Sequence, residues 1–512
     1  MSGSGGPGGS TTPWARALVA GGGISGLVAA LELRRAGLEV TVLEASGRWG
    51  GCIGAHEVAG LTLDSGAESF ATRTDAVRTL VQEIGLGDDI VPPHPAGAWV
   101  LLPDGPSELP KTGVLGIPAN PWDPEVRRAL GLPGSVRASL DRWLPVGGQA
   151  RQVSVADLVR ARMGRRVLDR LVAPVVGGVH SADPAMLDAD MVAPGLRRLM
   201  AEKGSLAAAV AAQRGASRGQ KAGSAVAGVS GGLHRVVQAL VQRLEADGVR
   251  LVLGQRVDRL ERSAGDDGAP RWRVGAVAPA SEGPEDVPAR PEQLYEADVV
   301  VVALGGPAAV ELLSDAVPAL AGHEPVPGPE VKLVTLVLDC PALDARPRGT
   351  GVLVAPQVPG IGAKALTHAT AKWDWLSARA GEGTHVVRLS YGRAGDPPAQ
   401  IAEAGADPET DDELFAAAVQ DASALLGVAI SPDDVLGWDV VRWEGALPFA
   451  TVGHRDRVAA IRSLVAAQPG LAVVGGWAAG NGLAAVVPDA RAQATAIAAA
   501  VGSPDPEQRP SA

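Results

Sequence analysis

Three glycines near the start of the chain, Gly21, Gly23 and Gly26, follow the short apolar run ALVA with the spacing G-x-G-x-x-G. In this spacing the first glycine permits a tight turn, the second lets backbone approach a pyrophosphate, and the third lets a helix pack on a strand. An apolar helical stretch and a second strand follow, and that strand ends at Glu44, where an acid can accept the ribose hydroxyls. The order of elements therefore predicts a dinucleotide-binding unit rather than an isolated glycine turn.

The residues after Glu44 indicate which dinucleotide is bound. The stretch ASGRWGG places Arg48, Gly50 and Gly51 directly behind the expected ribose-binding acid. A second glycine pair beside a cation suits a two-sided grip on an extended FAD molecule. A solvated surface charge is the alternative interpretation of Arg48, and the glycine pair beside it makes FAD binding the favoured one.

The composition bounds the class of protein. Apolar residues make up 46% of the 512 residues and charged residues 20%, which is typical of a globular chain with a large core. The net charge of −11 argues against general nucleic-acid binding, which needs a basic face. The longest apolar run, at 471–487, contains four glycines and an asparagine and falls short of a span of ~20 residues.

Two cysteines, Cys52 and Cys340, lie far apart and form neither a C-x-x-C pair nor a metal-ligand spacing. We therefore expect reduced thiols in a cytoplasmic protein with no bound metal. The first residues are rich in glycine and serine and show no signal-peptide pattern. No transmembrane segment is expected, and peripheral membrane contact stays open.

The order of helical and strand-like stretches predicts an α/β fold whose Rossmann-like, FAD-binding domain is assembled from three segments. We place the domain boundaries as follows: FAD-binding domain 14–85, 230–308 and 465–503; a mixed-sheet, substrate-binding domain 86–110 and 309–464; a helical domain 111–229; and flexible tails 1–13 and 504–512.

Several single elements follow from local pattern. The run DVVVVAL at 298–304 predicts a buried parallel strand, and 154–179 is the clearest helical stretch. A helix is expected at 411–426, and a long alanine-rich helix is expected to start near Leu483. The Gly-, Pro- and acid-rich stretch 263–292 is interpreted as a surface loop.

Longer motifs resemble a known family. They are VLEASGRWGG, SGAESF, VSGGLHRVVQAL, RWEGALPFATVGHRDRV and, most diagnostic, SVADLVRARMGRRVLDRLVAPVVGGVHSADP at 154–184. With these motifs the chain resembles, over roughly 15–500, the flavin-dependent porphyrinogen oxidases of haem synthesis within the amine-oxidase-like FAD superfamily. It looks most similar to the bacterial, oxygen-dependent coproporphyrinogen III oxidase type.

The resemblance implies an enzyme in which FAD carries the chemistry and O2 reoxidises it, giving H2O2. Coproporphyrinogen III would lose six electrons and six protons in three hydride transfers from meso carbons to the flavin, and coproporphyrin III could pass to a ferrochelatase. Protoporphyrinogen IX is the alternative substrate. Another flavin amine oxidase or desaturase, or a binding protein without catalysis, are further alternatives that the motif at 154–184 and the intact glycine pair disfavour.

The resemblance, with the motifs above, names the residues expected at the cofactor. They are Gly21, Gly22, Gly23, Ile24, Ser25, Gly26, Glu44, Ala45, Arg48, Gly50, Gly51, Gly66, Ala67, Glu68, Ser69, Val257, Trp443, Gly476, Gly482, Leu483 and Ala484. The residues Gly482, Leu483 and Ala484 stand where the family usually has Gly-Ile-Pro, so the flavin contact there is expected to differ.

The carboxylates of the substrate need cations. Arg73 resembles a position that faces the substrate in the family, and Lys332, Lys372, Arg393 and Arg442 lie in substrate-type segments. For each of these a solvated surface role is an equal alternative.

Other departures from the family also bear on substrate and mechanism. The absence of an arginine in HPAGAWVLLPDG favours coproporphyrinogen over protoporphyrinogen. No catalytic side chain is nominated, because the flavin does the chemistry. His180 and His454 are conceivable proton acceptors, but structural roles are favoured for both.

Overall fold

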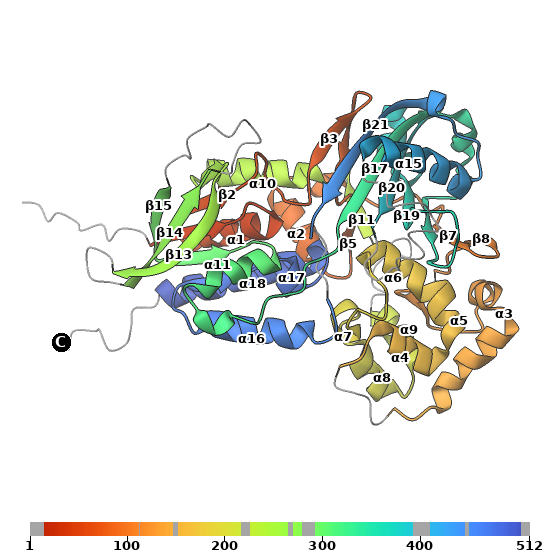
Figure 1. Cartoon of the computed structure of the whole chain (residues 1–512), viewed down its shortest axis with the longest axis horizontal. Coiled ribbons are helices and arrows are strands. Elements are labelled where there is room, and N and C mark those ends of the chain that lie inside the picture. Colours follow the sequence, from red (N-terminus) through yellow and green to blue (C-terminus); the bar gives the residue numbers. More distant parts are fainter. Residues whose placement is uncertain are drawn as a thin grey trace, which may run out of the picture.

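The computed structural model describes residues 15–111, 113–146, 152–216, 226–264, 270–278, 292–392, 410–445 and 450–502. Figure 1 shows a parallel sheet with its helices at one end, and a mixed sheet and a group of helices at the other. The predicted fold class is confirmed: segments far apart in the sequence build the parallel sheet, and the other two parts are inserted between them.

The parallel sheet has five strands in the order β12-β2-β1-β16-β22. Their bounds are β1 Arg16–Ala20, β2 Glu39–Glu44, β12 Arg250–Leu253, β16 Val299–Val302 and β22 Leu471–Val473. All four residues of β16 are buried, as the run of valines predicts. A strand covered on both faces needs such a run, because neither face meets water.

Helices cover both faces of this sheet. Side chains alternate along β1, so Ala17 and Val19 join one core and Leu18 and Ala20 join the other. The first core includes α1 Ile24–Arg35, α10 His234–Ala246 and α18 Leu483–Gly502, and the second includes α11 Gly306–Ser314 and α16 His454–Ala466. The helix expected near Leu483 is confirmed.

A three-stranded antiparallel sheet corrects the expectation of a loop at 263–292. It consists of β13 Arg256–Ala264, β14 Pro270–Val277 and β15 Gln293–Ala297. Every second residue of β14, Trp272, Val274 and Ala276, is fully buried, as in a strand with one buried face. This alternation outweighed the proline and glycine content that suggested a loop. The rest of the expected loop lies mostly outside the described residues.

The mixed sheet has seven strands in the order β21-β17-β20-β19-β18-β7-β8. Their bounds are β7 Trp99–Leu102, β8 Gly105–Glu108, β17 Val331–Asp339, β18 Gly351–Val354, β19 Ala365–His368, β20 Thr384–Tyr391 and β21 Val435–Trp443. The helix α15 Asp411–Leu426 packs on one face, as expected, and begins with a capping box between Thr410 and Glu413.

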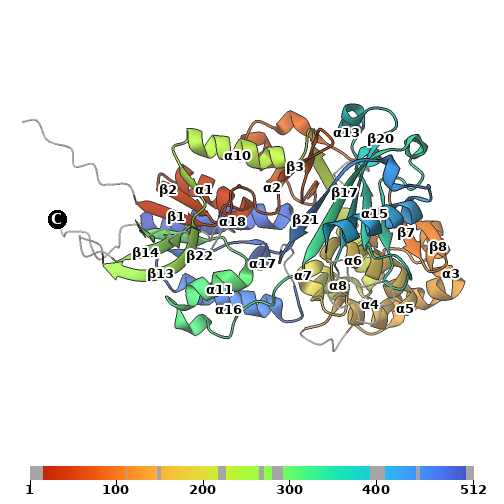
Figure 2. The same ribbon diagram turned by 45° about the horizontal axis from the view of Figure 1, so that its top comes forward.

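The helical region, which lies between β10 and β11 in the sequence, has its own hydrophobic core. Its helices are α3 Pro124–Ser139, α4 Val155–Met163, α5 Arg165–Val167, α6 Ala173–His180, α7 Ala189–Val192, α8 Leu196–Lys203 and α9 Leu206–Ala216. The helical stretch expected at 154–179 is broken at Gly164, whose φ of +90° ends α4. Figures 1 and 2 both place this region beside the mixed sheet, away from the parallel sheet.

Shorter elements join the parts. They are β3 Ala55–Val58, β4 Leu61–Asp64, β5 Phe70–Ala71, α2 Ala76–Glu83, β6 Ile90–Val91, β9 Gly113–Val114, β10 Ile117–Pro118, β11 Val226–Val229, α12 Ala369–Lys372, α13 Asp374–Ala380 and α17 Gly476–Ala479. The small sheet β5-β11-β6 pairs residues from both sides of the helical region.

Two buried histidines face each other in the mixed sheet. His368 Nε2 lies 3.0 Å from His385 Nδ1, and His385 Nε2 lies 3.1 Å from Asp344 Oδ1. Burial lowers the pKa of His368 to about 3, and it also lowers the pKa of His385. Both rings are therefore neutral in the folded protein near pH 7.

Acid is therefore expected to destabilise the fold. In the unfolded chain His368 regains a pKa near 6.5, so that state binds a proton first, and the free energy of unfolding falls as pH drops below about 6.5. One such group contributes at most roughly 1.4 kcal/mol per pH unit. Urea unfolding of His368→Gln at pH 7 and pH 5 should show a weaker pH dependence than the natural protein. The partly exposed His323, substituted to Gln, serves as the control, and an unchanged dependence in His368→Gln would contradict the argument.

Candidate functional site

The glycine turn between β1 and α1 is set by close backbone contacts. Gly21 has a φ of +109°, and a Cβ added at Gly26 would lie 2.0 Å from the Gly21 carbonyl oxygen. A Cβ at Gly22 would lie 2.4 Å from the Trp49 ring, whereas a Cβ at Gly23 would meet nothing within 4 Å. Gly21, Gly22 and Gly26 are thus needed for the turn itself, and Gly23 borders open space.

That open space lies at the N-terminus of α1. Gly23 is the N-cap residue, and neither a side-chain cap nor an acid occupies the first turn, which includes Ile24 and Ser25. The first backbone N–H groups of a helix without such a cap favour an anion, because they and the helix dipole present positive charge. The turn can therefore receive a pyrophosphate.

Glu44 fixes the turn from the end of β2. Its Oε2 accepts a hydrogen bond from Gly22 N at 2.7 Å, and its Oε1 accepts one from Ser46 N at 2.8 Å. A carboxylate has about four acceptor positions, so it can also accept from a ribose hydroxyl. Ala45 follows as the first residue past the strand.

The second glycine pair lies against the first turn. Gly50 N donates to Gly22 O at 2.9 Å, and Arg48 Nη1 donates to Gly51 O at 2.9 Å. The Arg48 guanidinium lies 4.9 Å from the centre of the Trp443 ring. The structure thus brings together Arg48 and Trp443, two expected cofactor residues from opposite ends of the chain.

The remaining cofactor candidates lie on or beside other strands and helices. Val257 lies in β13, two residues after Gln255, whose N donates to Glu44 O at 2.8 Å. Gly476 begins α17, and Gly482, with a φ of +85°, precedes α18. Leu483 and Ala484 are buried in the core shared with α1, so the N-termini of both helices belong to one packed unit.

These features fit FAD. A cradle that only glycine permits, an uncapped helix N-terminus and an acid at the end of β2 are the groups that a dinucleotide requires. Bound there, FAD would be held by Gly21–Gly26, Glu44 and the pair Gly50 and Gly51. Contact of the other named residues with FAD stays a prediction.

The segment between β4 and β5 carries Gly66, Ala67, Glu68 and Ser69. Glu68 is paired: Lys372 Nζ lies 2.5 Å from its Oε1, and Arg388 Nη2 lies 3.5 Å from its Oε2. Burial alone would raise the pKa of Glu68, but Lys372 and Arg388 hold it below its ordinary value. Glu68 is therefore ionised near pH 7.

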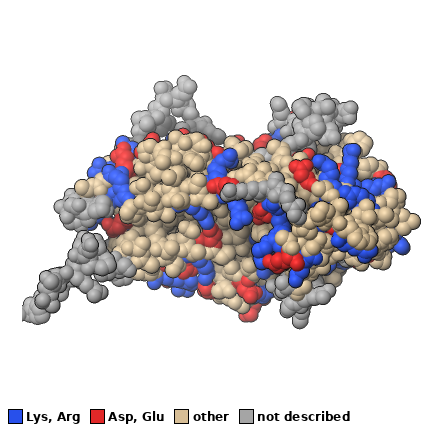
Figure 3. All heavy atoms as spheres, turned by 90° about the horizontal axis from the view of Figure 1, so that it is seen from below, with Lys and Arg blue, Asp and Glu red and all other residues tan. Residues whose placement is uncertain are grey.

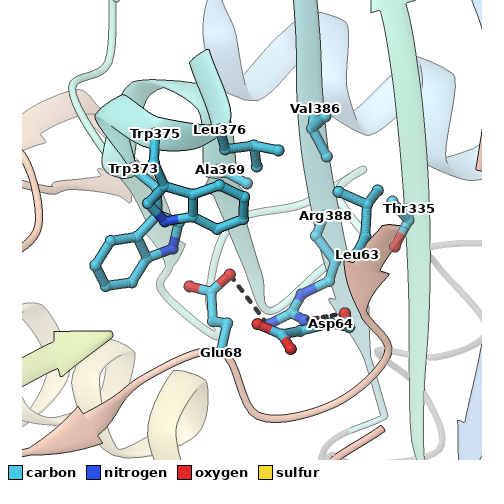
Figure 4. A pocket seen from close by; sticks show the side chains of 10 residues that line it. All are labelled: Leu63, Asp64, Glu68, Thr335, Ala369, Trp373, Trp375, Leu376, Val386 and Arg388. Carbon is cyan, nitrogen blue, oxygen red and sulfur yellow. Dashed lines mark hydrogen bonds and ion pairs between the residues drawn. The ribbon is translucent and has the colours of Figure 1, made fainter. Parts of the chain in front are cut away.

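Glu68 and Arg388 line a cavity of about 30 Å³, drawn in Figure 4. Thr335 and Trp375 also line it, and their buried Oγ1 and Nε1 atoms have no hydrogen-bond partner among the described residues. This volume accommodates one or two water molecules, which would satisfy both groups. Arg388 was not predicted as a site residue; the signal for it in the sequence is a single arginine within the apolar strand THVVRLSYG.

The substrate-side cations are placed differently from one another. Arg73 is exposed, and burial of part of its side chain lowers the pKa of its guanidinium. Lys332 is buried in β17, with Nζ 4.0 Å from Glu330 Oε2. Lys372 is paired with Glu68, Arg442 is paired with Asp411, and Arg393 lies outside the described residues.

The two candidate histidines, His454 and His180, differ in their surroundings from a freely titrating side chain. His454 is buried, with Nε2 2.6 Å from the Trp477 carbonyl oxygen, and this contact joins α16 to α17. Burial lowers the pKa of His454, and it lowers the pKa of His180 to about 4. The preference for structural roles at both positions stays a prediction.

The surface carries mixed charge. Figure 3 shows basic and acidic side chains interspersed on one face, with several basic side chains at the end that holds the helical region. Among the described residues no helix has the length and apolar character needed to cross a bilayer. The same residues contain no group of three His, Cys, Asp or Glu side chains placed to bind a metal ion.

Known proteins are similar to this chain in sequence and in fold. The family described as flavin containing amine oxidoreductase matches residues 24–502. The coproporphyrinogen III oxidase of Mycobacterium tuberculosis (strain H37Rv) is 30% identical over 94% of this chain and 96% of its own length. That of Propionibacterium freudenreichii is 29% identical over 94% and 90%. A crystal structure of a protein from Exiguobacterium sp. 255-15 has a TM-score of 0.74 and covers 96% of this chain and 99% of its own, at 24% identity, which supports the fold alone.

The two glycines Gly23 and Gly26 give a matched test of the cradle. Gly26→Ala should disrupt the turn and lower both flavin content and stability, because its Cβ would overlap Gly21 O. Gly23→Ala should fold normally, since Gly23 has a φ of −66°, but its methyl group would enter the space expected for the pyrophosphate. Flavin absorbance per protein after desalting, together with urea unfolding, measures both effects. Normal flavin retention in Gly23→Ala would contradict this placement.

Proposed function

The chain belongs to the flavin-containing amine oxidoreductase family, and from that premise we propose that it oxidises coproporphyrinogen III to coproporphyrin III with FAD and O2. The observation that carries the proposal is the likeness to enzymes named coproporphyrinogen III oxidase over 94% of this chain. The glycine cradle and the acid at the end of β2 support flavin binding independently of that likeness.

The proposed oxidation does not require a catalytic side chain. FAD, when bound, supplies the oxidant: three two-electron steps remove six hydrogens from the porphyrinogen, and O2 takes up the electrons as H2O2. The chain would hold the cofactor at the glycine turn, orient the macrocycle and exclude water. Because His454 Nε2 already contacts the Trp477 carbonyl oxygen, we do not assign His454 the role of a general base.

We propose that the mixed-sheet part, 86–110 and 309–464, binds the porphyrinogen and that the helical part 111–229 encloses it. Coproporphyrinogen carries four propionates and protoporphyrinogen two, so the first needs more cations. Arg73, which lies in the FAD-binding segment 14–85, would be available to a propionate at the boundary of the two parts, because it is exposed and shows no acidic partner among the described residues. Lys332 beside Glu330 and Lys372 on Glu68 are less free to bind a carboxylate.

The location and the next step are part of the proposal. Cys52 and Cys340 are free, which supports a reducing compartment such as the cytoplasm. The product is a metal-free porphyrin, so a metal-inserting enzyme such as a ferrochelatase would consume it.

Aerobic turnover tests the proposal. The purified protein should convert coproporphyrinogen III to a fluorescent porphyrin at least about tenfold more efficiently, by kcat/KM, than protoporphyrinogen IX, a difference of roughly 1.4 kcal/mol. Three H2O2 should form per porphyrin. Preference for protoporphyrinogen IX would overturn the substrate assignment, and flavin that stays oxidised with both would overturn porphyrinogen oxidation.

Arg73 and Arg78 form a matched pair of exposed arginines, one before α2 and one within it. Arg73→Gln should raise KM for coproporphyrinogen III by about tenfold, since a charge-assisted hydrogen bond contributes on the order of 1.5 kcal/mol or more. Arg78→Gln should leave KM unchanged. Equal KM values in both variants would remove Arg73 from the substrate site.

A further inference from the structure

Glu68 is held by side chains from a different part of the fold. Glu68 follows β4, whereas Lys372 ends α12 and Arg388 lies within β20 of the mixed sheet. All three side chains are largely buried, with relative exposures of 11%, 17% and 14%. Trp373 also helps to lower the pKa of the same carboxylate. The Glu68 carboxylate thus forms ion pairs with two cations of the mixed-sheet part.

Arg388 also holds the backbone around Glu68. Its Nη1 donates to Asp64 O at 3.0 Å and to Gly66 O at 2.7 Å, while its Nη2 faces Glu68 (Figure 4). The planar guanidinium has five N–H donors in a fixed geometry, so it can serve a carboxylate and two carbonyls at once. A lysine at this position would keep the charge and lose most of these bonds.

The other side of this segment touches the cofactor-binding turn. A Cβ at Gly66 would lie 2.0 Å from Cys52 O, and Ala67 N donates to the same oxygen at 3.1 Å. Cys52 directly follows the second glycine pair, in which Gly50 N donates to Gly22 O. A continuous line of contacts therefore runs from Arg388 through Gly66 to the glycine turn.

A second contact fixes the same segment from β21. Trp443 Nε1 donates to Ser65 O at 3.0 Å, and the Trp443 ring faces Arg48 at 4.9 Å. Ser65 and Gly66 are thus held by two strands of the mixed sheet, β20 and β21. The mixed sheet and the turn are joined through these few residues.

We propose that Glu68, Lys372 and Arg388 form an interdomain clamp, defined as these three residues, that positions Ser65–Ala67 against the glycine turn and so sets FAD affinity. In this role Glu68 contacts the cations and not the cofactor, and Lys372 binds Glu68 and not a propionate. This proposal concerns FAD binding alone and does not depend on which porphyrinogen is the substrate. FAD retention therefore tests it separately from turnover.

Arg388→Lys tests the positioning role in the holoenzyme. FAD release on dilution, followed by flavin fluorescence, should be about tenfold faster than in the natural protein, because two carbonyl hydrogen bonds are lost while the charge stays. The absorbance spectrum of the bound flavin should shift, and KM for the porphyrinogen should change less than about twofold. Unchanged FAD release would overturn the proposal.

Arg170→Lys is the matched control. Arg170 likewise joins two parts of the fold, since its guanidinium binds the Asp104 carboxylate at 2.6 Å and its Nε donates to Ala129 O at 2.6 Å. It lies in the helical region, away from the glycine turn. Its substitution should leave FAD release unchanged, and an equal effect in both variants would show a general loss of stability and overturn the positioning role.

Two further variants separate the clamp from direct substrate binding. Lys372→Met removes one of the two cations on Glu68 and leaves the Glu68–Arg388 pair intact. It should therefore release FAD faster than the natural protein, but more slowly than the double variant Glu68→Gln with Lys372→Met, which leaves Arg388 buried without its carboxylate. If Lys372→Met instead retains FAD and raises KM more for coproporphyrinogen III than for protoporphyrinogen IX, Lys372 binds a propionate and the clamp is overturned.

Discussion

The close approach of backbone at the glycine turn is the constraint on which the rest of the molecule depends. The carbonyl of Gly21 lies where a Cβ of residue 26 would stand, and Gly50 donates to Gly22 across the same turn. This packing leaves the N-terminus of α1 uncovered in front of Gly23. Because the sheet behind it is covered on both faces, the turn has a rigid base, and its open side presents the N-terminus of α1, where an anion is favoured.

The mixed sheet must be held in a fixed relation to that turn if a substrate on one is to reach a flavin on the other. Hydride transfer requires the reacting atoms to be held about 3–3.5 Å apart, so small displacements matter. The contacts of Arg388 with Gly66 and of Trp443 with Ser65 join the two parts at the segment nearest the turn. Buried charges are costly unless paired, and pairing them across this boundary makes separation of the two parts unfavourable.

Local pattern was sufficient for the parts whose structure is set by near neighbours. At Gly26 the clash that excludes other residues arises within the turn itself, at the Gly21 carbonyl oxygen, whereas a Cβ at Gly22 would meet the Trp49 ring farther along the chain. The valines of β16 and the capped helix α15 follow from burial and from capping, which are also local. Strand β14 was missed because its alternation lies in a segment rich in proline and glycine, and only pairing with β13 and β15 fixes it.

The sequence by itself determined the dinucleotide unit, the three-segment assembly and the likeness to porphyrinogen oxidases, because spacing and motif are properties of the linear chain. Only the tertiary structure decided the partners of the charged side chains. Lys372 and Arg73 look equally available to a substrate in the sequence, yet one is paired with Glu68 and the other is exposed. Arg48 contacts Trp443, and Arg388 contacts Glu68, because strand order and register bring these distant segments together. No local pattern in the sequence links the two residues of either pair.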